Sequence, residues 1–349
     1  MDPFRIHVAD AVLDDLLARL RHTRWPDQVP GIGWGQGTEL DWLRRLVSYW
    51  ESEFDWRAWE RKLNALNQFT WEGIHFVHQR AASGRGVPLI LTHGWPSSFL
   101  DYVDMLPMLE DFDVVVPSLP GYGFSPRPPQ VGINYRYVSE RWHRLMTELG
   151  YSRYGAGGND FGSGVSTLLA VDHPESVMGI HLTTLESDLT PKVDNSELSD
   201  MERSYLAVSR GWDVTERGYS AIQSTKPQTV GYGLNDSPAG LAAYSARSGT
   251  RGAASRRPTI SFALPSLCTG SRRPSPRRCA TIGTIAGTRS IPRTSVRPRR
   301  SRSSRTRPFP RASRRARMSS GCTTSSAGQC FLAAGTLPQL RNRRRPQGT

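Results

Sequence analysis

The stretch from Tyr154 to Ala170, YGAGGNDFGSGVSTLLA, constrains the fold more than any other part of the chain. Small residues fill its first half, and its second half carries apolar residues at helical spacing. A polar residue between small neighbours, where a strand meets a helix, is typical of a nucleophile elbow, because the sharp turn excludes bulk and lifts one side chain above the sheet. That residue is Asp160, between Gly158 and Gly162. The attacking group would therefore be a carboxylate, and the intermediate an ester.

The same pattern fits a second interpretation. Asp160 could simply cap the helix that follows a glycine-rich turn. A single glycine-rich motif does not decide between these two interpretations.

Strands and helices alternate around this stretch. Apolar strand patterns lie at 87–91, 112–116 and 177–182, and helical patterns follow 97 and 135. Such alternation predicts an α/β fold with a mostly parallel sheet and helices on both faces.

Four regions follow from the changes in pattern. Residues 1–80 begin with two amphipathic helical segments, whose aromatic stripes are more typical of packing than of a ligand site, and end in an alternating strand pattern at 69–78. Residues 81–184 form the predicted core. Residues 185–244 mix polar helix and loop and interrupt the alternation, as an inserted cap would.

The fourth region, residues 245–349, has a different composition. It holds 24 Arg and all 4 Cys, but no Asp, Glu, Lys or His. Its net charge of +24 contrasts with −10 for residues 1–244, where 21 basic residues face 31 acidic ones. With little apolar periodicity, this region is expected to be largely disordered.

Several classes of protein are disfavoured by the sequence. No apolar run of 18 residues predicts a membrane span, and the acidic start MDPFRIHVADAVLDD is unlike a signal peptide. Cys268, Cys279, Cys322 and Cys330 have neither metal-ligand nor disulfide-framework spacing. We expect a cytoplasmic protein that needs no metal and no cofactor.

Five motifs occur in a fixed order. HGWPSS, PSLPGYGFS and GGNDFGSG each follow a strand pattern, and GYSAIQSTKP and GLNDSPAGLAA lie in the cap region. Together they resemble the α/β-hydrolase epoxide hydrolases, in the branch with an N-terminal extension (the microsomal and juvenile-hormone type). The resemblance covers roughly residues 1–244.

This resemblance implies a chemistry for individual residues. Asp160 would attack an epoxide carbon, and Tyr219 would give a proton to the opening oxygen, a role suited to a neutral phenol; taken alone, Tyr219 could equally be a packing residue. The backbone N–H groups of Trp95 and Phe161 would form the oxyanion hole. His93, with Gly94 and Pro96 of the same motif, would shape the loop. The implied reaction turns an epoxide and water into a vicinal diol, in detoxification or aromatic hydrocarbon catabolism.

Other hydrolases of this fold remain alternatives. Dehalogenases also use an Asp nucleophile, but often place a Trp after it whose ring N–H can hold halide. Phe161 cannot donate such a bond, which favours the epoxide. A serine esterase is disfavoured because Asp160 occupies the elbow.

The catalytic triad is incomplete in this sequence. The general base and its acid should follow the cap in the order nucleophile, acid, His. No His follows His181 and no acid follows Asp236, and His181 precedes the cap. We therefore expect impaired turnover, with stalling at the Asp160 ester.

A frameshift would explain the Arg-rich region. When each codon is shifted by one base, Cys279–Ile282 is compatible with Met-Arg-Tyr-Tyr and Gly335–Gln339 with Arg-His-Phe-Ala-Ala. These and two further matches occur in the order of the family's later motifs and share one shift direction. The rival interpretation is a non-enzymatic protein whose basic tail binds nucleic acid nonspecifically.

Overall fold

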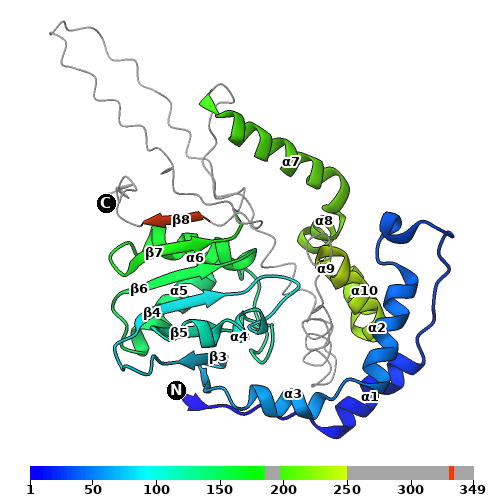
Figure 1. Ribbon diagram of the computed structural model, residues 1–349, viewed down its shortest axis with the longest axis horizontal. Coiled ribbons are helices and arrows are strands. Elements are labelled where there is room, and N and C mark those ends of the chain that lie inside the picture. Colours follow the sequence, from blue (N-terminus) through cyan, green and yellow to red (C-terminus); the bar gives the residue numbers. More distant parts are fainter. Residues whose placement is uncertain (185–196, 250–329, 334–349) are drawn as a thin grey trace, which may run out of the picture.

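The computed structural model describes residues 1–184, 197–249 and 330–333 (Figure 1). The strands of this part form one sheet in the order β1-β2-β3-β5-β4-β6-β7-β8. The parallel centre consists of β5, β4, β6 and β7, while β1 to β3 and β8 pair antiparallel at the two edges. The bounds are Asp2–Pro3 (β1), Gln68–Trp71 (β2), Ile74–Gln79 (β3), Val87–Thr92 (β4), Phe112–Pro117 (β5), Tyr154–Gly158 (β6), Val177–Leu182 (β7) and Cys330–Ala333 (β8). This mostly parallel sheet, flanked by helices, confirms the α/β-hydrolase fold class.

The two faces of the sheet build two separate cores. Neighbouring residues of a strand point to opposite faces, so Val115 enters one core and Val114 and Val116 enter the other. The first core contains α5 (Tyr135–Glu148) and α6 (Phe161–Asp172). The second contains α3 (Trp56–Leu63), α4 (Leu100–Val103) and the short 3-10 helix Leu106–Met108.

The N-terminal extension starts with the two helical segments expected from the sequence. They are α1 (Asp10–Arg21) and the pair α2 (Leu40–Ser52) and α3, with a 3-10 turn at Gly33–Gln36 between α1 and α2. Trp50 and Trp56 are each 5% exposed, so these members of the aromatic stripe are packing residues as predicted. The strand pattern at 69–78 becomes the hairpin β2–β3, turned by Glu72 and Gly73, both with positive φ.

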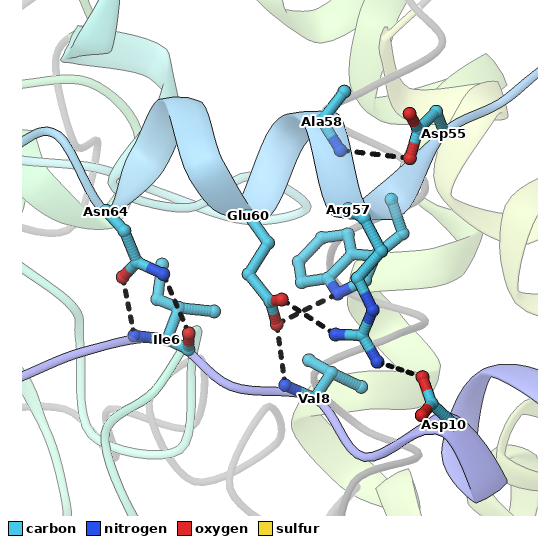
Figure 2. A network of polar contacts seen from close by, with 9 residues as sticks. Ile6, Val8, Asp10, Asp55, Arg57, Ala58, Glu60 and Asn64 are labelled. Atoms are coloured by element: carbon cyan, nitrogen blue, oxygen red, sulfur yellow. Dashed lines mark hydrogen bonds and ion pairs between the residues drawn. The ribbon is translucent and has the colours of Figure 1, made fainter.

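Polar contacts fix the chain before α1 against α3 (Figure 2). The Glu60 carboxylate accepts hydrogen bonds from the Val8 N–H at 2.7 Å and from the Arg57 guanidinium at 2.7 Å. Arg57 also bonds to Asp10, and the Asn64 amide exchanges two bonds with the backbone of Ile6. The chain before α1 is therefore anchored to α3 as well as to the sheet through β1.

Four consecutive helices occupy the region for which the sequence predicts a cap, and they are called the cap below. They are α7 (Asp200–Glu216), α8 (Gly218–Thr225), α9 (Pro227–Asp236) and α10 (Pro238–Gly249), which makes this part more helical than its sequence suggested. Helix α10 lies beside α1 and α2 in Figure 1, and Ala239 and Ala242 pack there against Leu20, Leu43 and Leu46.

Hydrogen bonds reinforce this contact. Arg19 donates to the carbonyls of Asn235 and Asp236, and Thr38 donates to the carbonyl of Ala243 at 2.6 Å. The N-terminal extension therefore carries the cap.

The C-terminal region differs from expectation at two places. Helix α10 continues past residue 244, and β8 pairs with β7 inside a region expected to be disordered. Residues 250–329 and 334–349, which include all four frameshift matches and most of the proposed nucleic-acid-binding tail, lie outside the described residues. None of the helices in the part that the structure describes combines the length and apolar character needed to cross a membrane.

Candidate active site

The turn after β6 holds Asp160 in a strained conformation. Its φ of 49° and ψ of −123° are unusual for a residue with a side chain, and Phe161 begins α6 directly after it. Its backbone N–H donates to Thr184 Oγ1 at 2.9 Å. This geometry is that of an elbow between strand and helix.

At three positions around Asp160 only glycine fits, because neighbouring atoms lie where a Cβ would be. A Cβ on Gly162 would lie 1.8 Å from the Thr92 carbonyl oxygen, and one on Gly158 would lie 2.4 Å from the Gly162 backbone. A Cβ on Gly94 would lie 2.4 Å from Asp160 Cβ. The small residues that the sequence places around Asp160 therefore let β4, β6 and α6 converge on it.

Two backbone N–H groups converge on one oxygen of Asp160. Oδ1 accepts from the Trp95 N–H at 3.0 Å and from the Phe161 N–H at 2.7 Å. Burial raises the pKa of the carboxyl, and these two donors lower it in part. The structure thus brings together the expected nucleophile and both expected oxyanion donors. Pro96 follows Trp95 through a cis peptide bond.

His93 is fully buried behind this loop, and both its ring nitrogens are occupied. Nε2 accepts from the Leu119 N–H at 3.1 Å, so Nδ1 carries the proton and donates to the Gly94 carbonyl at 3.1 Å. Burial lowers the pKa of His93 to about 4. This arrangement suits a residue that shapes the loop and is unsuited to proton transfer.

Tyr219 of α8 reaches the site through aromatic packing. Its ring stacks on the Trp95 indole with a centroid distance of 4.8 Å and an angle of 16°. Trp212 packs edge-on against Tyr219, and Tyr244 packs edge-on against Trp95. The Tyr244 hydroxyl also donates to the Tyr219 carbonyl at 3.3 Å. The candidate proton donor thus lies on the residue whose N–H binds Asp160.

Other polar residues near Asp160 had no role assigned from the sequence. Asp101 of α4 lies beside the turn, where burial raises the pKa of its carboxyl against a hydrogen bond from Asn159. Tyr122 belongs to the PGYGFS loop after β5 and packs on His93. The motif drew attention to that loop, but only the fold shows that the Tyr122 ring packs on the histidine of the HGWP loop.

The described residues offer no obvious metal centre, since no three His, Cys, Asp or Glu side chains gather in a ligand-like group there. The chemistry available is that of a buried carboxylate with two fixed N–H donors under an aromatic wall. Such a site can form a covalent ester and stabilise negative charge on its carbonyl oxygen.

Two family descriptions match the chain. "Epoxide hydrolase N terminus" matches residues 1–102, and "alpha/beta hydrolase fold" matches residues 87–211. The first covers the extension and the HGWP loop, and the second covers the elbow.

Individual relatives agree with these matches. A putative epoxide hydrolase of Stigmatella aurantiaca is 40% identical over 257 residues, covering 69% of this chain and 58% of the relative. Epoxide hydrolase 1 of Sus scrofa is 33% identical over 279 residues, covering 69% of this chain and 60% of the relative. The chain thus spans about three fifths of the length of the curated relatives it matches. The structure of Aspergillus niger epoxide hydrolase superposes with a TM-score of 0.71 at 29% identity, covering 81% of this chain and 78% of that one.

Proposed function

Because this chain belongs to the α/β-hydrolase epoxide hydrolases that carry the N-terminal epoxide hydrolase domain, we propose that its site opens epoxides through an ester at Asp160. The observation that carries the proposal is the pair of N–H donors on Asp160 Oδ1. They leave Oδ2 as the attacking oxygen. They also place Oδ1 where the carbonyl oxygen of the ester needs its donors.

The first step needs only the side chains of Asp160 and Tyr219. Oδ2 bonds to an epoxide carbon as the bond between that carbon and the ring oxygen breaks, and the Tyr219 phenol gives its proton to the released oxygen. A buried phenol suits this role because it is neutral at pH 7 and still donates strongly. In the second step, water attacks Cγ of Asp160, and the charge develops on Oδ1 between the N–H groups of Trp95 and Phe161.

The second step needs a base that these 349 residues do not supply. His93 is bound to backbone through both ring nitrogens, and no His follows His181 in the sequence. We propose that this chain accumulates the ester instead of releasing diol at a normal rate. The shifted reading frame stays a prediction, which resequencing the DNA across codons 235–265 tests. The cytoplasmic location also stays a prediction.

Intact-mass spectrometry of the full chain tests the proposal. After incubation with styrene oxide, the protein should gain the mass of one epoxide molecule, and peptide mapping should place the adduct on Asp160. Asp160→Asn should abolish the adduct, and Tyr219→Phe should slow its formation by about tenfold to a hundredfold. An adduct of equal yield in Asp160→Asn would contradict the assignment of the nucleophile, and rapid diol release by the wild-type chain would contradict the stall.

A further inference from the structure

Tyr122 has a buried hydroxyl that the mechanism above does not use. The hydroxyl oxygen is shielded from solvent and has no hydrogen-bond partner among the described residues. Buried polar groups in folded proteins are nearly always bonded, so such an atom calls for a functional or solvent-mediated explanation. Asn159 Oδ1, directly before the nucleophile in the chain, is another buried polar atom without a partner among the described residues.

The loop holds the Tyr122 ring in place. The Tyr122 N–H donates to the Leu119 carbonyl at 2.9 Å, and the Ser125 N–H donates to the Tyr122 carbonyl at 2.9 Å. The ring packs edge-on against His93 with a centroid distance of 5.3 Å. His93 is itself bound to Leu119, so the ring and its support form one rigid unit.

This unit lies against the nucleophile. Gly94 follows His93 and touches Asp160 so closely that a Cβ there would overlap its side chain. Burial raises the pKa of the Tyr122 hydroxyl, and the charge of Asp160 raises it further. Asp160 Oδ1 already has two donors, whereas no described residue donates to Oδ2.

We propose that Tyr122 is a positioning residue for the nucleophile, whose hydroxyl donates through one bound water to Oδ2 of Asp160. The assignment of Oδ2 as attacking oxygen rests on the proposed function, but the contact itself does not. The bond would fix the rotation of the carboxylate, so that Oδ2 faces the substrate. It would also favour the ionised form that attacks.

The variant Tyr122→Phe isolates the hydroxyl, because the ring that packs on His93 remains. The full chain is labelled with 13C at the Asp carboxyl groups and titrated by NMR, with the Asp160 signal assigned by its absence in Asp160→Asn. Removing a donor to the carboxylate should raise the pH midpoint of the Asp160 titration by about one unit. Below the midpoint, ester formation with styrene oxide should then slow by about tenfold. Because the hydroxyl has no protein partner, Tm should be unchanged or slightly raised.

Tyr151→Phe is the matched control. The Tyr151 hydroxyl bonds to Asp113 Oδ2 at 3.0 Å and to His78 at 2.9 Å, away from the elbow. Its loss should lower Tm and leave the Asp160 midpoint and the pH profile of ester formation in place.

Each outcome separates this inference from the proposed function. An Asp160 midpoint in Tyr122→Phe equal to that of the wild type overturns the inference, whether or not ester forms. A shifted midpoint in a chain that forms no ester supports the inference and overturns the proposed function. A drop in Tm comparable to that of Tyr151→Phe, with no shift in midpoint, would make Tyr122 a purely structural residue.

Discussion

The two halves of the candidate site are held in place by different forces. Asp160 is fixed by tightly packed backbone around it. At Gly94, Gly158 and Gly162 the packing leaves no room even for a methyl group. Tyr219 is held by ring stacking on Trp95 and by a cap whose helix α10 rests on the N-terminal extension. One half is set by steric exclusion and the other by contacts between separate elements.

This difference has a consequence for stability and motion. The elbow cannot shift without moving β4, β6 and α6 together, because each forms part of the close approach. The cap can shift when α10 leaves α1 and α2, which need not disturb the sheet. Helix α7 has the weakest packing in this region, since none of its residues is buried. We therefore expect substitutions in the elbow to affect the whole fold, and substitutions in the cap contact to act locally.

The largest effect is expected from Gly162→Ala. The new Cβ would lie 1.8 Å from the Thr92 carbonyl oxygen, which belongs to a central strand and cannot give way as a flexible side chain could. We expect a loss of about 3 kcal/mol or more in the free energy of unfolding, measured by urea denaturation.

Gly233→Ala in α9 is the matched control for this change. Gly233 also lies in a helix, but a Cβ there has no neighbour within 4 Å. Ala should stabilise the helix by up to about 1 kcal/mol. Equal effects of the two substitutions would mean that steric exclusion does not hold the elbow.

The sequence predicted the elbow well because its constraint is local. Glycines around Asp160 and the flanking strand and helix patterns specify a turn of this kind, and the strand at 177–182 matches β7 in full. The two N–H donors follow from the same motifs, since their positions depend on backbone alone. The helical pattern after residue 97 produced only a short helix, because α4 ends at Val103 and a 3-10 turn at Leu106–Met108 follows.

The long-range contacts were beyond prediction from the sequence. Tyr122 and His93 lie on different loops, and nothing in either pattern indicates that their rings pack together. The support of the cap by α1 and α2 depends on Ala239 and Ala242, small residues that look the same in an exposed helix. Packing between elements distant in sequence decides such features.

An intermediate effect is expected from Ala242→Glu. Ala242 is 1% exposed and faces Leu43 and Leu46, so a carboxylate there would be buried without a partner. We expect the free energy of local opening of α10, measured by hydrogen exchange, to fall by about 2 to 3 kcal/mol, while that of β4 and β6 stays unchanged. Ester formation should slow as well, because Tyr219 moves with the cap.

Ala207→Glu in α7 provides the comparison for that variant. It adds the same charge to an exposed position of a cap helix and should leave exchange unaltered. If Ala242→Glu lowered the protection of β4 and β6 as much as that of α10, the cap and the core would be one cooperative unit, and the contrast between the two halves would fail.

The smallest effect is expected from Glu60→Gln, which tests whether the extension that carries the cap has its own anchor. Burial raises the pKa of Glu60, but hydrogen bonds from the Val8 N–H and Arg57 outweigh it, so the pKa lies below its usual value of 4.5. A lowered pKa in the folded state adds stability above pH 4.5, and this contribution disappears as the pH falls through the folded-state value. Gln keeps an acceptor for Val8 but loses the charge that faces Arg57.

We expect Glu60→Gln to cost about 1 kcal/mol at pH 7, measured by urea denaturation, and the gap to the wild type to close below pH 4. Glu51→Gln on α2, where the carboxylate has no such contacts, should show neither effect. A gap that stayed constant down to pH 3 would mean that Glu60 acts through its shape and not through its charge. The chain before α1 would then be held against α3 without a contribution from the Glu60 charge, and acid would not loosen this contact.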